Sequence, residues 1–160
     1  MKIKIISAGG TIDKVYFDRM SEYKVGKPQI IEMLKEANFD LELDFASVLK
    51  KDSLDFTDED RLLIKKTVED DNLSHFVITH GTDTMIETAR ILKDITGKVI
   101  VLTGSMLPAN FKFSDAPYNI ACALMAVQLL KPGAYIVING KVFYPDKVQK
   151  DRKSNRFIDI

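Results

Sequence analysis

The chain has 160 residues, of which 46% are hydrophobic, 9% aromatic and 29% charged. This composition is typical of one globular domain and argues against a disordered chain. The 23 Lys and Arg residues balance the 23 Asp and Glu residues, which argues against a nucleic-acid-binding protein or a polybasic membrane anchor. One cysteine, Cys122, excludes an internal disulfide, and two histidines leave few routes to a metal site.

No targeting segment is recognisable at the start of the chain. The apolar stretch within residues 1–6 is too short and too interrupted for a signal peptide. No run approaches the ~20 apolar residues that a membrane span needs. The sequence therefore predicts a cytoplasmic protein without a membrane partner.

The first part of the chain predicts a strand, an irregular segment and a helix. Residues 2–7 predict a strand that runs directly into Gly9-Gly10. Residues 12–27 are mixed in character and predict an irregular segment, and long segments of this kind are often functional. Pro28 favours the start of a helix, and the apolar face of this helix would consist of Ile30, Ile31, Leu34 and Ala37.

The middle of the chain alternates strands and helices. Residues 41–49 predict a strand, and Thr57, which precedes three acidic residues, predicts a helix N-cap. Residues 75–79 predict a buried strand, and residues 84–92 predict a helix. Residues 99–102 are continuously apolar, as in a strand that is covered on both faces. The apolar face of the helix after Thr57 would consist of Leu62, Leu63, Ile64 and Val68.

The last part of the chain predicts a long helix and two further strands. Ser114 or Asp115 would cap a helix over residues 116–130, in which Met125 and Leu129 are assigned to the core rather than to a dimer contact. Residues 135–138 predict a fifth strand. Asn139-Gly140 is typical of a hairpin turn, and Phe157-Ile158 predicts a last short strand.

This alternation predicts an α/β fold in one domain over residues 1–160. We expect a three-layer, mostly parallel, doubly wound open sheet of the flavodoxin-like or Rossmann-like kind. In the strand order 2-1-3-4-5, a ligand would bind between strands one and three, beyond their carboxyl ends. These strands end in Gly9-Gly10-Thr11 and in Gly81-Thr82-Asp83-Thr84. Strand two brings Ser53 near this cleft, and strand four brings Thr103-Gly104-Ser105.

The residues at this cleft favour acyl transfer from an amide. The signature motifs of dinucleotide-binding proteins, P-loop proteins, serine hydrolases and zinc proteases are absent. A Thr hydroxyl becomes a nucleophile only when a base takes its proton, and glycine-flanked amides can stabilise an oxyanion. His80 is interpreted as a packed strand end rather than as this base. A single Gly-Thr turn is more often a tight turn with a helix cap, but two such turns at one cleft favour a function.

Four segments resemble a known family in the right order. Ala8-Gly9-Gly10-Thr11-Ile12 and Thr79-His80-Gly81-Thr82-Asp83-Thr84 resemble the two signature motifs of the L-asparaginases of the bacterial type I and type II kind. Thr103-Gly104-Ser105-Met106-Leu107-Pro108 and Ser114-Asp115-Ala116-Pro117-Tyr118-Asn119 match later segments. The resemblance implies an amidohydrolase without a metal or cofactor, which acts on L-asparagine or a related small carboxamide. It also implies a homodimer or a higher homo-oligomer.

The same resemblance implies roles for individual residues. Thr11 resembles the family nucleophile, and Tyr23 resembles the mobile-loop tyrosine that activates it. Thr82, Asp83 and a lysine form a second triad, and alignment of residues 139–150 places this lysine at Lys150, although Lys147 and Lys153 are close. Without the family, Lys150 would be read as a solvated tail residue. The implied substrate-binding residues are Gly10, Ser53, Gly81 and Ser105.

Three departures from the family pattern leave alternatives open. Ala8 replaces a hydroxyl residue, and Leu54 replaces a polar residue that helps to hold the substrate. By the resemblance, the sequence stops where the catalytic domain of the family ends, so we expect the usual second domain to be absent. The alternative functions are a small-molecule or amino-acid binding domain that has lost turnover, and a subunit whose second domain is a separate chain.

Overall fold

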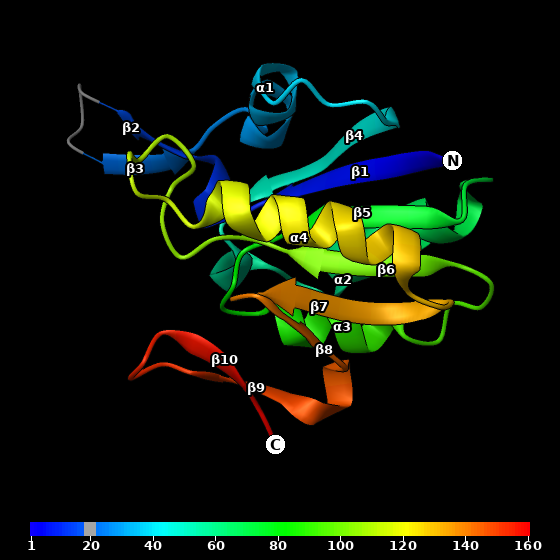
Figure 1. Cartoon of the computed structure of the whole chain (residues 1–160). Helices are drawn as coiled ribbons and strands as arrows, with labels where there is room; N and C mark the ends of the chain where they lie inside the picture. Colours follow the sequence, from blue (N-terminus) through cyan, green and yellow to red (C-terminus); the bar gives the residue numbers. More distant parts are fainter. Residues whose placement is uncertain (18–21) are drawn as a thin grey trace.

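A six-stranded sheet forms the centre of the computed structural model, which describes residues 1–17 and 22–160 (Figure 1). The strand order is β4-β1-β5-β6-β7-β8. The first five strands pair in parallel, and the last is antiparallel to its neighbour. This order confirms the predicted one and adds an antiparallel edge strand. The strands are β1 (Lys2–Gly9), β4 (Glu42–Lys51), β5 (His75–Thr79), β6 (Val99–Thr103), β7 (Gly133–Ile138) and β8 (Lys141–Phe143).

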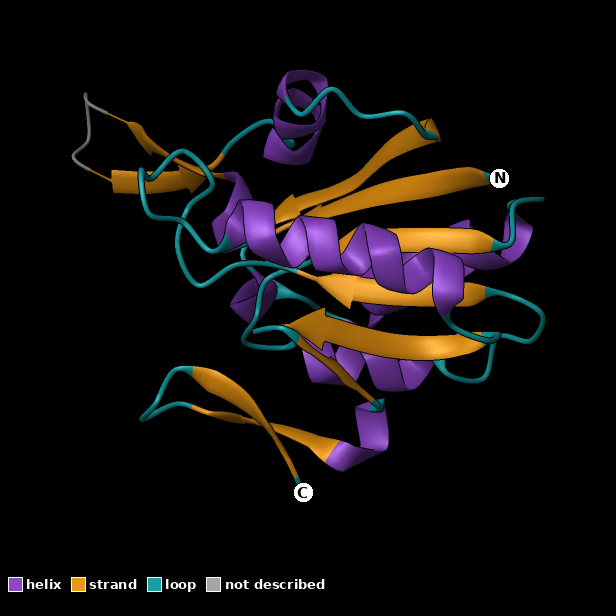
Figure 2. Ribbon diagram, in the orientation of Figure 1, coloured by secondary structure: helices purple, strands orange, loops and turns teal. Residues whose placement is uncertain are grey.

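Helices cover both faces of this sheet (Figure 2). Helices α2 (Asp58–Asp70) and α3 (Met85–Leu92) pack on one face, and α1 (Gln29–Glu36) and α4 (Ala116–Leu129) pack on the other. β5 and β6 lie in the middle of the sheet, and their apolar side chains are buried because both faces are covered. The predicted three-layer α/β fold is therefore confirmed. No helix in the described part of the chain is long and apolar enough to cross a membrane.

The start of α2 follows the sequence signal closely. The Thr57 hydroxyl accepts a hydrogen bond from the Asp60 amide at 3.3 Å, and the Asp60 carboxylate accepts one from the Thr57 amide at 3.0 Å. This reciprocal pair satisfies two amides that a helix start leaves without partners. The predicted N-cap is confirmed, and such caps stabilise a helix by about 1 kcal/mol.

Some residues of the predicted apolar faces are exposed. Leu62 and Leu63 are 55% and 47% exposed, because α2 turns Ile64 and Val68 toward the sheet instead. Met125 and Leu129 are 57% and 76% exposed, so their assignment to the core is also wrong. Ala37 is exposed and follows α1. An apolar residue shows that a face could be buried, whereas the neighbouring elements decide which face is buried.

Within residues 12–17 and 22–27, most of the segment predicted to be irregular forms regular elements. A 3₁₀ turn over Thr11–Asp13 is followed by an antiparallel hairpin of β2 (Lys14–Phe17) and β3 (Glu22–Val25). Tyr16 lies opposite Tyr23 in this hairpin. Both rings are about half exposed, and no side chain whose burial is described in β2 or β3 is fully buried. The described part of the hairpin therefore lacks the buried apolar alternation that marks a strand. Residues 18–21 of this predicted segment lie outside the described residues.

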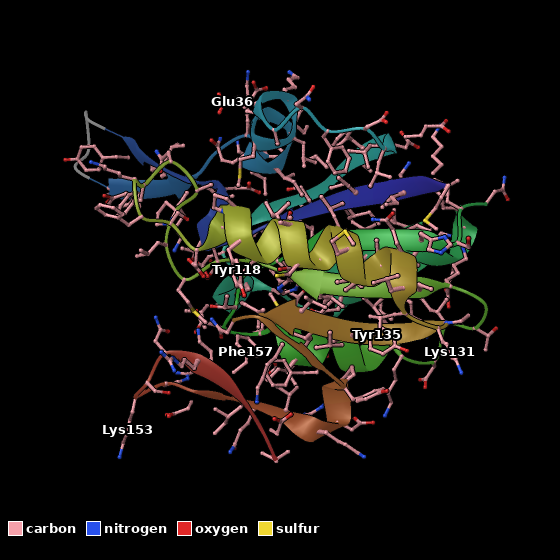
Figure 3. The ribbon with its side chains drawn as sticks, viewed as in Figure 1. Glu36, Tyr118, Lys131, Tyr135, Lys153 and Phe157 are labelled. Atoms are coloured by element: carbon pink, nitrogen blue, oxygen red, sulfur yellow. The ribbon has the colours of Figure 1, made fainter. Side chains whose placement is uncertain are left out.

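A second hairpin ends the chain and packs on the α3 side of the sheet. Its strands are β9 (Val148–Asp151) and β10 (Arg156–Asp159), and they follow a 3₁₀ turn over Pro145–Lys147. Phe157 is buried against Phe143, with ring centroids 6.4 Å apart. Figure 3 shows its ring between the hairpin and the sheet. The predicted last strand is confirmed, and its burial fixes β9 beside the sheet.

Candidate active site

The carboxyl ends of β1 and β5 lie side by side, and the turns that follow them are in backbone contact. Ser7 of β1 pairs with Thr79 of β5. Gly10 adopts φ +91°, and a Cβ atom on it would lie 2.4 Å from the N and Cα atoms of Gly81. Only glycine combines this backbone conformation with so close an approach. The contact therefore brings together the turns that carry Thr11 and Thr82.

Thr82, Asp83 and Lys150 form one hydrogen-bonded group. The Lys150 ammonium donates to the Thr82 hydroxyl at 2.8 Å and to the Asp83 carboxylate at 2.8 Å. Thr82 is buried, and the Lys150 side chain is 11% exposed. A lysine 67 residues distant in sequence thus reaches the turn after β5. Lys150, rather than Lys147 or Lys153, occupies this position.

The C-terminal hairpin holds Lys150 in place. Lys150 of β9 lies opposite Phe157 of β10, whose ring is part of the core. The Phe157 backbone amide donates to the Asn139 side-chain oxygen at 3.2 Å, and the Asn139 backbone amide donates to the Asn119 side-chain oxygen at 3.1 Å. Asn119 also donates to the carbonyl of Gly104, at the end of β6. The position of Lys150 is therefore tied to the ends of β6 and β7.

Ser53 presents a buried hydroxyl beside the Gly81 turn. Ser53 is 1% exposed, and its hydroxyl has no hydrogen-bond partner within the described part of the chain. A Cβ atom on Gly81 would lie 2.4 Å from this oxygen. The Thr84 hydroxyl donates to the Ser53 carbonyl at 2.7 Å and fixes the segment. A buried hydroxyl without a partner is costly, so this position is suited to a polar group of a ligand.

Thr11 and Tyr23 are less closely assembled. Thr11 is half-buried at the start of its 3₁₀ turn. Tyr23 is 50% exposed on β3, and its ring contacts Tyr16 and Phe111 with centroids 5.4 and 6.0 Å away. No hydrogen bond joins Tyr23 to Thr11, although the structure describes both residues. The structure brings Tyr23 to the Thr11 side of the sheet without completing a pair.

Ser105 lies at the end of β6, but its hydroxyl is engaged within its own turn. It donates to the Leu107 carbonyl at 2.5 Å. The Asp115 carboxylate accepts from the Met106 and Leu107 amides at 3.0 to 3.1 Å and fixes this turn. Ser105 therefore does not join the group around Lys150.

His80 is a packed residue at the end of β5. Its ring is fully buried, with one nitrogen 2.8 Å from the Gly81 carbonyl and the other 2.8 Å from the Thr88 hydroxyl. Burial lowers the pKa of His80 to about 4. The imidazole is therefore neutral at pH 7, and both ring nitrogens are occupied by protein groups. No cluster of three or more metal-ligating side chains occurs within residues 1–17 and 22–160.

Asp13 was missed by sequence reasoning. It is 1% exposed, and its carboxylate accepts hydrogen bonds from the Ser7 hydroxyl at 3.0 Å and the Gln29 amide at 2.8 Å. Burial raises the pKa of Asp13 to about 6, although both hydrogen bonds act in the opposite direction. The available signal was an acidic residue two positions after Thr11, in a segment that the sequence predicts to be irregular.

Comparison with known proteins identifies the family. A family model described as asparaginase, N-terminal, matches residues 2–157. The thermostable L-asparaginase from Thermococcus kodakarensis is 30% identical and superposes with a TM-score of 0.87, which covers 100% of this chain and 51% of that one. A probable cytoplasmic L-asparaginase from Campylobacter jejuni is 28% identical with a TM-score of 0.78, covering 93% and 48% of the two chains.

A curated relative described as a probable periplasmic L-asparaginase, from Haemophilus influenzae, is 34% identical over 160 residues. The match covers 92% of this chain and 46% of that protein. The chain spans about half the length of the curated relatives it matches. The family model and the structural neighbours agree with the two glycine turns and with the fold, and the chain belongs to the asparaginase family, in which it corresponds to the N-terminal domain.

Proposed function

We propose that the chain is the catalytic part of an amidohydrolase that hydrolyses the side-chain amide of L-asparagine, or of a related small carboxamide, to the acid and ammonia. The observation that carries the proposal is the Lys150 ammonium, which lies 2.8 Å from both the Thr82 hydroxyl and the Asp83 carboxylate. The backbone contact between Gly10 and Gly81 supports it, because it places the Thr11 turn beside this group.

In the first step, the Thr11 oxygen attacks the carboxamide carbon. As the Thr11 proton passes to the Tyr23 oxygen, the Tyr23 hydroxyl gives its own proton to the amide nitrogen, which leaves as ammonia when the tetrahedral oxyanion collapses and the C–N bond breaks. Backbone amides of the Gly10 and Gly81 turns would stabilise the oxyanion. This role requires the Tyr23 hydroxyl to lie within hydrogen-bond reach of Thr11 when substrate is bound.

In the second step, water hydrolyses the ester on Thr11. Lys150, once it has lost a proton, accepts the Thr82 proton, and Thr82 accepts one from water. The resulting hydroxide attacks the ester carbon, and the Thr11 oxygen leaves with the proton that Lys150 returns through Thr82, which restores both the Thr11 hydroxyl and the Lys150 amine. The Asp83 carboxylate orients the Lys150 side chain toward Thr82. The sum of both steps is one amide and one water converted to one carboxylate and one ammonium ion.

Ser53 is the proposed substrate-binding hydroxyl. It is buried, lacks a partner within the described part of the chain and abuts Gly81. A substrate carboxylate would supply the missing acceptor and would place the amide near Thr11. Ser105 would have to release the Leu107 carbonyl to take part. The proposed reaction uses no metal or cofactor.

The test is ammonia release from L-asparagine, L-glutamine and a panel of small carboxamides. Wild type should release ammonia from at least one of them. Thr11→Ala and Lys150→Met should each lower the steady-state rate by about 10²-fold or more. Wild-type rates in both variants would refute the proposal.

A binding domain without turnover is the second candidate. One observation favours it, namely the 63% exposure of Leu54 beside Ser53. Calorimetry that shows amino-acid binding without product formation would support this candidate. Turnover that depends on Thr11 would exclude it.

We further propose a cytoplasmic homodimer or higher homo-oligomer, in which residues 1–160 act as one catalytic domain. The exposed apolar side chains of α4, among them Met125 and Leu129, support self-association. Light scattering of the purified chain and fractionation of the source cells test the two parts of this proposal. A monomer at all concentrations would refute the first part.

A further inference from the structure

Asp13 carries a carboxylate that is 1% exposed. Within the described part of the chain, no Lys, Arg or His side chain forms an ion pair with Asp13. Its two oxygens accept hydrogen bonds from neutral donors, the Ser7 hydroxyl and the Gln29 amide. Burial of a carboxylate without a cation is costly, and the positive end of the α1 dipole at Gln29 offsets only part of this cost. The fold therefore retains an expensive group two residues after Thr11.

The backbone of Asp13 extends the same set of contacts. Its amide donates to the Gly10 carbonyl at 3.2 Å, and its carbonyl accepts from the Gly26 amide at 2.6 Å. With the side-chain bonds, one residue joins β1, the turn that carries Thr11, the end of β3 and the start of α1. The first pair of the hairpin, Lys14 with Val25, follows directly. The hairpin is thus anchored to the sheet through Asp13.

This anchor fixes both proposed catalytic groups of the first step. Thr11 precedes Asp13 within a single 3₁₀ turn, and Tyr23 lies two residues before Val25 on the anchored hairpin. The Ile12 carbonyl also accepts from the Ala109 amide at 3.1 Å, in the loop that supplies Phe111 to the Tyr23 ring. Movement of this turn would change the separation between the Thr11 and Tyr23 hydroxyls.

We infer that Asp13 is a positioning residue for amide hydrolysis, which holds the Thr11 turn and the Tyr23 hairpin in a fixed relation through its bonds to Ser7, Gln29, Gly10 and Gly26. This inference rests on the proposed function. Asp13 does not contact the reacting atoms and acts through Thr11 and Tyr23. Geometric errors of about 1 Å at reacting groups can cost 10²-fold in rate, so a residue of this kind affects turnover more than substrate binding.

The experiment compares Asp13→Ala with Asp13→Asn. The side chain of the Asp13→Asn variant can keep both side-chain hydrogen bonds. Its amide oxygen can accept from the Gln29 amide, and its amide nitrogen can donate to the Ser7 oxygen. Asp13→Ala should lower kcat at least tenfold with KM changed by no more than about twofold, whereas Asp13→Asn should stay within about threefold of wild type. Ser7→Ala removes only one of the two side-chain hydrogen bonds, so its kcat should lie between those of Asp13→Ala and Asp13→Asn. It also keeps the test open if Asp13→Ala fails to fold.

Hydrogen exchange measured by mass spectrometry supplies a readout that does not depend on turnover. In Asp13→Ala, the amides of residues 14–17 and 22–26 should exchange at least tenfold faster, while those of β5 and β6 should not change. Asp13→Asn should exchange as wild type does. If wild type releases no ammonia, the proposed function fails and exchange still tests the anchor.

Two outcomes would overturn the inference while the proposed function stands. In the first, wild type is active and Asp13→Ala shows wild-type kcat and wild-type exchange. In the second, Asp13→Asn is as impaired as Asp13→Ala, which would make the charge rather than the hydrogen bonds decisive. A kcat near the wild-type value in Asp13→Asn, together with hydrogen exchange as slow as in wild type, would support the inference.

Discussion

Two threonines stand at neighbouring strand ends, but their surroundings differ. Thr82 is buried, and its oxygen accepts a hydrogen bond from Lys150, which also contacts Asp83. Thr11 is half-buried, and its proposed partner Tyr23 is half-exposed on a two-stranded hairpin. One group is fully assembled within this chain, and the other is assembled only in part.

The difference follows from what anchors each partner. Lys150 lies opposite Phe157, whose ring is part of the main core on the α3 side of the sheet. Tyr23 belongs to a hairpin outside the main sheet, and an isolated two-stranded hairpin is marginally stable. The lesson is that the group proposed to activate water is fixed by burial, whereas the group proposed to attack the amide depends on a few hydrogen bonds at Asp13.

The largest expected effect separates the two threonines by the step at which each acts. Lys150→Met should lower steady-state turnover by about 10²- to 10⁴-fold, because water is no longer activated, yet it should still release up to one ammonia per site in a rapid first turnover. Thr11→Val should show no such burst. Quenched-flow measurement of ammonia from the best substrate distinguishes the two variants.

A burst in Thr11→Val and none in Lys150→Met would reverse the order of the two threonines. Circular dichroism of both variants provides the control, since each should retain the wild-type spectrum. Mass spectrometry of the quenched Lys150→Met variant should detect an acyl group on the peptide that contains Thr11.

The next effect tests the contact that brings the two turns together. Gly10→Ala places a Cβ atom 2.4 Å from the Gly81 backbone at φ +91°, and we expect a loss of about 2–5 kcal/mol in the free energy of unfolding, from overpacking and left-handed strain together. Gly97→Ala is the matched control, because Gly97 has φ +72° and no atom within 4 Å of its Cβ position. It should cost about 1 kcal/mol.

Urea denaturation of both variants measures this difference. Equal losses would mean that the Gly10–Gly81 contact relaxes without cost and that the two threonine turns are not rigidly coupled.

The third effect concerns the pH dependence of stability, for which two buried groups act in opposite directions. Asp13 has a pKa of about 6 in the folded state against 3.8 as its ordinary value, so stability falls as pH rises through this window, because the unfolded chain releases the proton first. His80 has a pKa of about 4 against 6.5, so stability is lost as pH falls through that window.

Asp13→Asn removes the first contribution and leaves the second. Relative to wild type, the free energy of unfolding of Asp13→Asn should therefore rise by about 2 kcal/mol between pH 4 and pH 7, because part of the two-unit shift of Asp13 takes effect below pH 4. Urea titrations at four pH values measure this difference. A constant difference across the range would show that the Asp13 carboxyl is not perturbed.

Local patterns were sufficient for much of the fold and for part of the site. Continuous apolar runs identified β5 and β6, and Thr57 with Asp60 identified the start of α2. Glycines before Thr11 and Thr82 indicated the two turns. Close backbone approach requires glycine, and this signal can be read from the local sequence without knowledge of distant contacts.

Features that depend on distant contacts were not predicted from local patterns. Lys150 carries no local signal and was located only through resemblance to the family, since its partner Asp83 is 67 residues away. The burial of Asp13 depends on Ser7 and Gln29, which no periodicity relates to it. The exposure of Met125 and Leu129 is set by which face of α4 meets the sheet, and the sequence of α4 is apolar on all sides.

The smallest expected effect tests how the Thr82 side is anchored. Asn139 has φ +54°, which glycine adopts freely, and its side chain accepts from the Phe157 amide. Asn139→Gly keeps the backbone and removes this acceptor, and should cost about 1 kcal/mol of stability. Asn155→Gly is the matched control, because Asn155 has φ +52° in the turn between β9 and β10 and an exposed side chain.

If Phe157 positions Lys150, then Asn139→Gly should slow release of the acid by a few-fold and leave the first release of ammonia unchanged, whereas Asn139→Asp, which retains an acceptor, should match wild type. Quenched-flow measurement of both products resolves the two steps. An equal slowing of both steps would mean that the C-terminal hairpin also supports Thr11, and the contrast between a core-anchored threonine and a hairpin-anchored one would then no longer hold.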